Sequence, residues 1–365
     1  MFLIDRRFLY FFDWKSFFTA MGLALIGLMF VFSATYKPEE PFSTFFKKEV
    51  LGILSGLFIY VLFSTQDPKN TCRMGYFAFF AVILLLFYTK LRGSVSLGGQ
   101  RWINIGFTKF QPSELAKLFL PAFLTYYFYT QNQYLKYKLN DFTVPIVILG
   151  LTFLLILKQP DLGTALIFGF SATLMLWFLG LNKKVFLYGA LFMIISAPVI
   201  WMTLKDYQRK RIEVFLGEGE SHKERYQIEQ SKIAIGSGGI AGKGFLKGTQ
   251  NKLSFLPEGR TDFIFSVMCE ELGFLGALFV LLLFLSLFLH LLNEITQIKD
   301  FFSKLLAIGL LSPFIFSTII NIGMVIGLLP IVGIPLPLMS YGISHLWTTF
   351  ACLGWINSII MRSKY

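Results

Sequence analysis

Long apolar runs separated by short polar turns occupy almost the whole chain. A helix needs about 20 consecutive, mainly apolar residues to cross a hydrocarbon core of about 30 Å. Ten runs of that kind are centred on residues 16–35, 48–64, 74–90, 112–130, 143–158, 162–181, 184–203, 262–291, 302–328 and 338–361. The pattern therefore predicts an all-α polytopic membrane protein with about ten transmembrane helices.

One polar segment, residues 204–261, is far longer than the turns and falls between the seventh and eighth runs. Its first half, 205–232, is charged and carries apolar residues such as Tyr207 and Ile228. This mixture is typical of short amphipathic helices that lie on a membrane surface. The chain shows no internal repeat and no low-complexity tail, so we expect a single membrane domain over residues 1–365.

The composition favours a membrane protein over a water-soluble one. Hydrophobic residues make up 55% of the 365 residues and charged residues only 15%, whereas a soluble domain carries roughly 25% charge. The formal net charge is +12, and a basic excess can indicate nucleic-acid binding. Here the charges lie in short loops between apolar runs, which fits anionic lipid headgroups or a phosphate-bearing substrate better. We expect no nucleic acid as a partner.

The basic residues of the short loops predict the orientation of the chain. Ten spans place both termini on one side of the membrane, and loops rich in Lys and Arg face the cytoplasm. Arg6 and Arg7 precede the first run, and Arg362 and Lys364 follow the last. We therefore expect both termini in the cytoplasm and residues 204–261 outside, as a large extracytoplasmic loop. The other loops on the cytoplasmic side carry Lys69, Arg73, Lys136, Lys138, Lys183, Lys184, Lys299 and Lys304.

A short outer loop, residues 90–111, departs from this charge pattern. It carries Lys90, Arg92, Arg101 and Lys109 but no acidic residue. The rule that sets orientation expects such residues mainly on the cytoplasmic side. The loop is therefore either a statistical exception or an external site for an anionic ligand.

Several ionisable residues lie within the apolar runs, where a charge costs a few kcal/mol and is kept for a partner or a task. Glu114 and Lys117 are three residues apart and so share one helix face. They either neutralise each other and hold two helices together, or Lys117 contacts a substrate phosphate while Glu114 orients it. Asp161, after Pro160, is either the N-cap of the following helix or a residue of a functional site. His345 is either a hydrogen-bonded histidine of the interior or a residue that contacts a ligand.

The eighth apolar run begins with acidic residues. Asp262 marks the boundary between the long polar segment and the helix, close to Glu258 and Arg260. This position suits a contact at the outer surface or a helix N-cap. Glu270 and Glu271 lie about two turns deeper, so we expect at least one of them to face a polar cavity or a lysine.

Glycine and lysine cluster in the second half of the polar segment. A Walker A motif would need Gly five positions before the Gly-Lys pair, but Ser237 stands there, and Lys243 is followed by Gly244. Glycine backbone N–H groups could still cradle a phosphate, with added charge from Lys243 and Lys247. The alternative is a flexible linker.

Short motifs occur in a fixed order along the chain. They are Gly99-Gln100-Arg101-Trp102-Ile103, Gln111-Pro112-Ser113-Glu114-Leu115-Ala116-Lys117, Lys158-Gln159-Pro160-Asp161-Leu162-Gly163-Thr164, Gln230-Ser231-Lys232-Ile233-Ala234-Ile235-Gly236, Leu256-Pro257-Glu258, Thr261-Asp262-Phe263, Gly333-Ile334-Pro335-Leu336-Pro337 and Ser340-Tyr341-Gly342. Each motif is weak alone, but together they span most of the chain. The sequence resembles the SEDS family (shape, elongation, division and sporulation), most closely its rod-shape members. It departs from the family pattern at Gly259-Arg260 and after the final Ser-Tyr-Gly.

The resemblance implies an enzyme that polymerises lipid II, the undecaprenyl-pyrophosphate-linked disaccharide-peptide, into peptidoglycan strands. The reaction takes place at the outer face of the bacterial cytoplasmic (inner) membrane. Such proteins work with a class B penicillin-binding protein, which cross-links the strands, and with other membrane proteins of the elongation complex. The short chain without long tails favours cell elongation over division or sporulation.

The family's key acidic residue maps onto Asp262, which the resemblance assigns as the general base for the acceptor sugar. A positioned base contributes roughly 10²–10⁴-fold, and cations around the leaving pyrophosphate contribute comparably. A divalent cation, Mg²⁺ or Mn²⁺, could share the phosphate work, but no His-Glu-x-x-His motif or Cys/His cluster predicts a protein-bound metal. The residues expected at the substrate are Arg101, Trp102, Lys109, Glu114, Lys117, Asp161, Lys243, Glu258 and Ser340.

Three other functions fit parts of the pattern. A lipid II flippase would move the lipid without making polymer, and it predicts charges along a path through the membrane. A non-catalytic scaffold of the cell-wall machinery would tolerate replacement of Asp262. A different polyprenyl-linked sugar polymerase or ligase would share the many helices and the large outer loop, but not this set of motifs. The charges concentrate at the outer side, which favours chemistry there.

Overall fold

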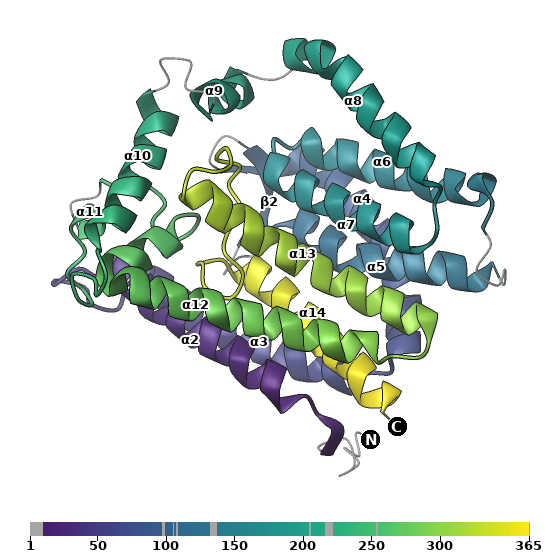
Figure 1. Ribbon diagram of the computed structural model, residues 1–365, viewed down its shortest axis with the longest axis horizontal. Helices are drawn as coiled ribbons and strands as arrows, with labels where there is room; N and C mark the ends of the chain where they lie inside the picture. Colours follow the sequence, from purple (N-terminus) through teal and green to yellow (C-terminus); the bar gives the residue numbers. More distant parts are fainter. Residues whose placement is uncertain are drawn as a thin grey trace.

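The computed structural model describes residues 10–96, 99–104, 106, 109–131, 137–203, 206–215, 222–252 and 255–364. Within these residues, each of the ten apolar runs forms a helix, and most of these helices run side by side (Figure 1). The helices are α2 (Trp14–Thr35), α3 (Thr44–Thr65), α4 (Pro68–Arg92), α5 (Pro112–Thr130), α6 (Thr143–Leu157), α7 (Leu162–Phe178), α8 (Lys183–Thr203), α12 (Ile264–Thr296), α13 (Phe301–Val325) and α14 (Ile343–Ser363). The predicted all-α polytopic architecture is confirmed.

Among the described residues, five helical segments are long and apolar enough to cross a membrane by themselves. They are α2, α4, α12, α13 and Leu139–Leu157, in which the short 3-10 helix η1 (Leu139–Phe142) leads into α6. The helix α7 is apolar but shorter, with 17 residues. Large apolar side chains such as those of Phe58, Leu84 and Phe192 are exposed on the outside of the helices. Lipid is the favourable surrounding for such a surface, and the protein is a multi-pass membrane protein.

Helices that are distant in the sequence hold the bundle together. The helix α14 packs along α3, α4 along α5, and α12 along α2, while α13 lies against both α5 and α7. A Cβ atom at Gly354 of α14 would lie 2.3 Å from the carbonyl oxygen of Tyr60 in α3, so the two helices approach closely because that residue is glycine. Nearly the whole length of α14 is buried. This central helix brings His345, near its start, into the interior.

The ends of the bundle differ in what they carry. Asp13, just before α2, accepts a hydrogen bond from His290 near the end of α12 at 2.8 Å, and its backbone N–H donates to Asn357 near the end of α14 at 3.1 Å. The start of α2 and the end of α14 therefore lie at the same end of the molecule, at the lower right of Figure 1. The helices of the 204–261 segment lie at the opposite end. Arg6, Arg7 and Lys136, which contributed to the predicted orientation, lie outside the described residues.

The short outer loop between α4 and α5 forms a small antiparallel sheet that packs against both helices. Its strands are β1 (Ser94–Ser96), β2 (Gly99–Asn104) and β3 (Lys109–Phe110), in the order β1-β2-β3. Ile103 pairs with Phe110 and Asn104 with Lys109. Backbone N–H and C=O groups that are partly buried need partners, and pairing the strands supplies them.

The 204–261 segment contains the helices α9 (Asp206–Phe215), α10 (His222–Ser237) and α11 (Thr249–Lys252). The prediction of short helices in its first half is confirmed. Their placement on the membrane surface stays a prediction; α10 also packs against α12. The buried Ser231 hydroxyl lies 2.8 Å from that of Ser266 and donates to the carbonyl oxygen of Val325 at 2.7 Å. The helix α10 is therefore part of the bundle wall.

The helix α12 is broken at Gly273, which has φ 67° and ψ −162°. Because this conformation is open mainly to glycine, the break is encoded at that residue. The backbone N–H groups of Phe274 and Leu275 donate to the carbonyl oxygens of Gly239 and Ile240 at 2.9 and 3.1 Å. The glycine-rich segment thus supplies the hydrogen bonds that the helix loses at its break.

The glycine-rich segment also donates hydrogen bonds to α12. The backbone N–H groups of Lys243 and Gly244 donate to the carbonyl oxygens of Glu270 and Glu271 at 3.0 and 2.9 Å. The flexible-linker interpretation is wrong, because the glycines are docked on α12. The N–H groups of Lys243 and Gly244 are also already bonded, so the expected phosphate cradle cannot use them in this conformation.

We expect Gly242→Ala to destabilise the protein by about 1–3 kcal/mol, the usual cost of overpacking. A Cβ atom at Gly242 would lie 2.1 Å from the carbonyl oxygen of Glu271, and its φ of +79° adds strain. Thermal unfolding in detergent measures the effect. Gly236→Ala is the matched control, since its Cβ atom would meet nothing within 4 Å. Equal unfolding temperatures for the two variants would contradict the docked geometry.

Candidate functional site

Asp262 lies at the end of the long polar segment, two residues before α12 begins at Ile264. Its backbone carbonyl oxygen accepts a hydrogen bond from the Asn321 side-chain amide at 2.8 Å, and the same amide donates to the carbonyl oxygen of Ile334 at 2.7 Å. Asn321 is fully buried in α13. One buried amide therefore ties Asp262 to the loop between α13 and α14.

That loop also meets Asp262 directly. A Cβ atom at Gly333 would lie 3.6 Å from the Oδ2 atom of Asp262, so the carboxylate lies beside a residue without a side chain. Asp262 itself is half-buried. The backbone of Asp262 is thus held in place, while the residue as a whole stays partly accessible.

Ser340 holds the residue before Asp262. Its hydroxyl group donates to the carbonyl oxygen of Thr261 at 2.6 Å and accepts from the backbone N–H of Leu336 at 2.8 Å. The side chain of Ser340 is fully buried. Nearby, the backbone N–H of Tyr341 donates to the carbonyl oxygen of Arg260 at 3.0 Å. We had expected Ser340 to contact substrate; its position in this conformation favours a role in shaping the loop.

Glu258 forms the turn that leads to Asp262. It adopts a left-handed conformation with φ 55°, and its carbonyl oxygen accepts hydrogen bonds from the backbone N–H groups of Thr261 and Phe263 at 3.1 and 3.2 Å. Its carboxylate accepts from the Thr261 hydroxyl at 3.0 Å. The two acidic residues therefore belong to one compact turn.

An aromatic and basic contact covers one side of this turn. The Arg260 guanidinium lies over the Phe45 ring, 4.1 Å from its centroid, and Phe45 packs edge-on against Tyr341. Glu49, buried in α3, accepts a hydrogen bond from the backbone N–H of Gly342 at 3.3 Å. The Phe45 ring therefore holds the Arg260 guanidinium, two residues before Asp262, in a fixed position.

Asp161 organises a second group of polar residues at the same end of the bundle. It caps α7 by accepting from the backbone N–H of Thr164 at 3.3 Å, which confirms the N-cap interpretation. Its carboxylate also accepts from the Gln111 amide at 2.6 Å and the Ser113 hydroxyl at 3.1 Å. Arg101 of β2 lies 3.4 Å from the same carboxylate. The capping residue therefore joins the sheet, α5 and α7.

We expect Asp161→Ala to destabilise the protein by about 1.5–3 kcal/mol, the value for hydrogen bonds to a charged group. The substitution leaves the buried Gln111 amide and the Arg101 guanidinium without their shared acceptor. Thermal unfolding measures the loss. Asp161→Asn keeps an N-cap oxygen and should lose less. An unchanged unfolding temperature for Asp161→Ala would show that this network does not hold the sheet.

The segment 332–334 lies between these two groups. A Cβ atom at Gly163, in the first turn of α7, would lie 2.8 Å from the carbonyl oxygen of Val332 and 2.6 Å from the Ile334 side chain. Gly333, between them, faces the carboxylate of Asp262. The start of α7 and the Asp262 turn therefore both approach one short loop.

The strand residues Trp102 and Lys109 stand next to the Asp161 group. The indole N–H of Trp102 and the Nε–H of Arg101 are buried and make no hydrogen bond with the residues that the structure describes. The carbonyl oxygen of Lys109 accepts from the Ser344 hydroxyl at 3.2 Å, which ties β3 to the start of α14. Donors that lack a protein partner are available to a ligand at this edge of the sheet.

Glu114 and Lys117 form the ion pair that their spacing predicts. The Lys117 ammonium lies 2.8 Å from one carboxylate oxygen of Glu114, and the His345 ring nitrogen Nδ1 lies 3.2 Å from the other. All three side chains are buried. The geometry favours the self-neutralising pair, extended by a histidine from α14. The proposed contact between Lys117 and a phosphate stays a prediction and would require this pair to open.

Lys243 pairs with Glu270 at 2.6 Å, so the expectation that an acid of α12 faces a lysine is confirmed. Glu270 also accepts from the backbone N–H groups of Thr249 and Gln250 at 2.7 and 3.1 Å. Glu271 accepts from the Ser33 hydroxyl of α2 at 2.5 Å. The two acids thus anchor the returning segment, and the phosphate contact expected of Lys243 stays a prediction.

The structure thus places Asp262 and Glu258 in one turn, which Ser340 holds from the loop between α13 and α14. Lys243 lies apart from this turn, beside Glu270, which is about two helical turns further along the chain than Asp262. Sequence reasoning missed Asn321 and Glu49 as supports of the turn. Both could have been found from the sequence, because each is a polar residue within an apolar run. Such a side chain is costly in a membrane and is kept for a partner or a task.

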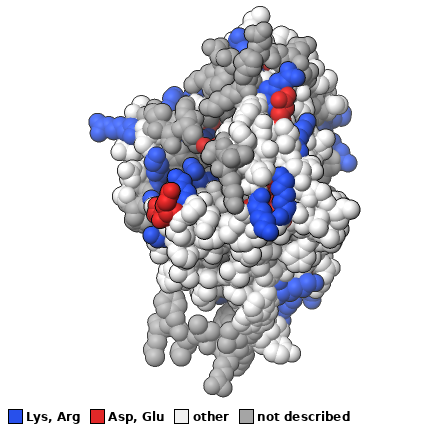
Figure 2. All heavy atoms as spheres, turned by 90° about the vertical axis from the view of Figure 1, so that its left-hand side faces the viewer, with Lys and Arg blue, Asp and Glu red and all other residues white. Residues whose placement is uncertain are grey.

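One end of the molecule is basic. Figure 2 views the end of the molecule that bears α10 and α11, and Lys and Arg side chains predominate over Asp and Glu on it. Within the described part of the chain, no three His, Cys, Asp or Glu side chains converge as metal ligands. The described residues therefore offer no ligand set for a divalent cation, and a cation that shares the phosphate work stays a prediction.

Comparison with known proteins decides the family. The family model described as the cell cycle protein family FtsW/RodA/SpoVE matches residues 13–365. The chain belongs to this family. It is 37% identical over 322 residues to the peptidoglycan glycosyltransferase MrdB of Escherichia coli K12, covering 87% of this chain and 86% of the relative. It is 33% identical to the peptidoglycan glycosyltransferase RodA of Treponema pallidum, covering 96% and 98%.

Solved structures show the same fold. A structure described as the structural coordination of polymerization and crosslinking by a peptidoglycan synthase complex matches this family member with a TM-score of 0.81 at 26% identity. The crystal structure of the rod shape determining protein RodA of Thermus thermophilus matches with a TM-score of 0.72 at 25% identity. Each comparison covers 97% of this chain and 98% of the other. The resemblance inferred from the motifs is confirmed.

Proposed function

We propose that this protein, a peptidoglycan glycosyltransferase like its relatives, uses Asp262 as the general base of glycosyl transfer. The observation that carries the proposal is the fixed position of Asp262. Its own backbone is held by Asn321, and the residues on its N-terminal side by Ser340 and Tyr341. A base must be held within hydrogen-bonding reach of the proton that it removes, and this turn provides such a support.

The proposed reaction joins two lipid-linked disaccharides of lipid II. The carboxylate of Asp262 takes the proton of the acceptor GlcNAc 4-hydroxyl as its oxygen attacks the anomeric carbon of the donor MurNAc. The new glycosidic bond forms as the bond from that carbon to the pyrophosphate oxygen breaks, and the electron pair leaves with the lipid pyrophosphate. An α-linked phosphate thereby becomes a β-glycoside. Pyrophosphate leaves readily, so no strong general acid is required.

The leaving pyrophosphate needs cations. Arg101 and Lys109 on the sheet edge are the proposed contacts, and the indole of Trp102 lines the same edge. Asp161 holds Arg101 in place through their 3.4 Å contact. Electrostatic groups that are oriented before the reaction stabilise developing charge without reorganising. Lys117 is buried against Glu114 and would join only if that pair opens, whereas Lys243 is partly exposed and has a donor left beside its contacts with Glu270 and Thr249.

The proposed orientation puts this site outside the cell. Both termini, at the end opposite α10 and α11, would face the cytoplasm of a bacterial inner membrane. Arg362 and Lys364 lie at the terminal end, as the distribution of basic residues requires. Residues 1–365 would form a single membrane domain, with 204–261 as its extracytoplasmic loop. A role in elongation follows from the resemblance to rod-shape members.

The proposed partner is a class B penicillin-binding protein. Glycan strands need a transpeptidase to become a network, and the structural relative described above belongs to a synthase complex that couples polymerization to crosslinking. Other membrane proteins of the elongation complex would join them. The proposed reaction at Asp262 uses lipid II as both donor and acceptor and needs no residue of the partner.

Polymerisation of lipid II by the purified wild-type protein in liposomes tests the proposed function. We expect glycan strands that a muramidase cleaves, with a higher yield when the transpeptidase partner is present. Lipid II that crosses the bilayer without forming polymer would instead identify a flippase. Neither polymer nor lipid movement, with or without the partner, would identify a scaffold.

A further inference from the structure

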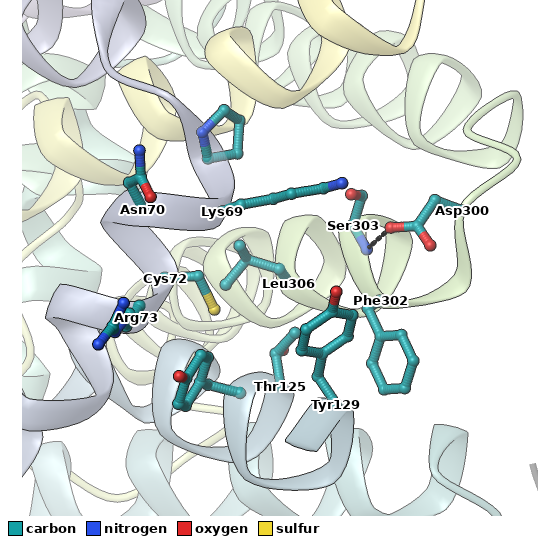
Figure 3. Close-up of a pocket in the computed structure, with 12 residues that line it drawn as sticks. Lys69, Asn70, Cys72, Arg73, Thr125, Tyr129, Asp300, Phe302, Ser303 and Leu306 are labelled. Atoms are coloured by element: carbon teal, nitrogen blue, oxygen red, sulfur yellow. Dashed lines mark hydrogen bonds between the residues drawn. The ribbon is translucent and has the colours of Figure 1, made fainter. Parts of the chain in front are cut away.

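A cavity of about 190 Å³ lies at the end of the bundle opposite Asp262 (Figure 3). It is formed by the first turns of α4, the last turns of α5 and the start of α13. Arg362, near the end of α14, donates to the carbonyl oxygen of Gln66 just before α4, which places the cavity at the terminal end of the molecule. The lining residues are Pro68, Lys69, Asn70, Cys72, Arg73, Thr125, Tyr126, Tyr129, Asp300, Phe302, Ser303 and Leu306.

The floor of the cavity is apolar and its rim is basic. Cys72 and Leu306 are buried at the floor, whereas Lys69 and Arg73 are exposed. Neither Lys69 nor Arg73 forms an ion pair with any residue that the structure describes. Figure 3 shows the Lys69 side chain extending toward α13. The rim therefore carries two basic side chains that are not paired with an acidic side chain among the described residues.

Two further residues define what the cavity can accept. Asp300 is the acidic residue of the wall, and its carboxylate accepts from the backbone N–H of Ser303 at 2.8 Å as the cap of α13. Thr125 is 3% exposed, and its hydroxyl oxygen is buried without a hydrogen-bond partner among the described residues. A buried hydroxyl without a partner is costly, so a ligand with an acceptor oxygen would satisfy it.

We propose that this cavity binds an anionic phospholipid from the adjacent membrane leaflet. The lipid phosphate would lie between Lys69 and Arg73, a glycerol ester oxygen would accept from the Thr125 hydroxyl, and one acyl chain would enter the floor beside Leu306. Basic pockets between transmembrane helices near the cytoplasmic side are typical sites for anionic headgroups. This site is independent of Asp262 and of the polymerisation reaction.

The surroundings favour a lipid over an acidic peptide. Met74 and Phe77, which follow Arg73 on α4, are 72% and 59% exposed, and Tyr129 at the end of α5 is 51% exposed. These side chains form an apolar belt with an aromatic residue near its edge, as at a membrane interface. A water-borne peptide would have to cover this belt, whereas a lipid in the leaflet already lies against it.

Native mass spectrometry of the purified full-length protein, first delipidated and then given phosphatidylglycerol or phosphatidylcholine, tests the proposal. We expect wild type to retain phosphatidylglycerol in preference to phosphatidylcholine. In Lys69→Gln/Arg73→Gln the affinity for phosphatidylglycerol should fall roughly tenfold or more, since two basic residues near the headgroup are lost. Ser303→Phe, which keeps both cations and fills the cavity, should also lose the lipid.

Lys183→Gln/Lys184→Gln is the matched control, because it removes two basic residues at the start of α8 and away from the cavity. It should bind phosphatidylglycerol as wild type does. The proposal is overturned if this control loses as much lipid as Lys69→Gln/Arg73→Gln, or if phosphatidylcholine binds equally well. It is also overturned if an acidic peptide or inorganic phosphate displaces the lipid at matched concentration. Size-exclusion profiles identical to wild type confirm that each variant is folded.

Discussion

Asp262→Asn should lower the rate of glycan polymerisation by about 10²–10⁴-fold, the contribution of a positioned general base. The amide has nearly the shape of the carboxylate but cannot take the acceptor proton. The backbone hydrogen bond from Asn321 to residue 262 does not involve the side chain, so the turn should remain. Rates are measured with purified protein and lipid II by separating the glycan strands on a gel.

Two variants control this result. Asp262→Glu keeps a carboxylate on a longer arm and should retain more activity than Asp262→Asn. Asp67→Asn changes an acid that also stands just before an apolar helix, the cap of α4, but at the opposite end of the bundle. Asparagine caps helices as well as aspartate does, so this variant should polymerise lipid II at the wild-type rate. Equal losses at Asp67 and Asp262 would indicate a general effect of removing charge.

Lys117→Met should destabilise the protein by about 3–5 kcal/mol, the cost of leaving one member of a buried ion pair without its partner. Glu114 is 4% exposed and, among the described residues, would keep the His345 ring as its hydrogen-bonding neighbour. The loss is measured as a lower unfolding temperature in detergent. Because α5 and α14 meet at this group, the substitution should lower the stability of the whole bundle.

The double variant Glu114→Gln/Lys117→Met separates charge from packing. It removes the stranded carboxylate, so it should recover much of the stability that Lys117→Met loses. If the single variant unfolds at the wild-type temperature, the ion pair does not hold the helices. If the double variant is no better than the single one, the lost stability comes from packing around the lysine stem.

The helices were predictable because their length is set by the membrane. Most apolar runs are about as long as the hydrocarbon core requires. The helix caps at Asp67, Asp161 and Asp300 lie in the polar turns between the runs. The Glu114–Lys117 pair was predictable for a similar reason, since three residues along one helix fix its geometry. Local rules of this kind need no knowledge of the remaining chain.

The supports of the site were not predictable in this way, because they come from residues far apart in sequence. Asn321 reaches residue 262, and His345 reaches Glu114 across 231 positions. The docked glycines were misjudged for the same reason. Gly238 and Gly242 lack side chains because α12 passes over them, and only the folded helix shows this. Sequence thus located the candidate residues, while packing decided which of them hold the turn.

The most direct test of Asp262 as the base compares lipid II affinity with turnover in one preparation of Asp262→Asn. A base acts on the reacting proton and contributes little to binding, so the dissociation constant for lipid II should stay within about threefold of wild type while turnover falls about 10²–10⁴-fold. Polymerisation by Asp262→Asn at the wild-type rate, or a loss of turnover fully matched by a loss of affinity, would contradict the assignment.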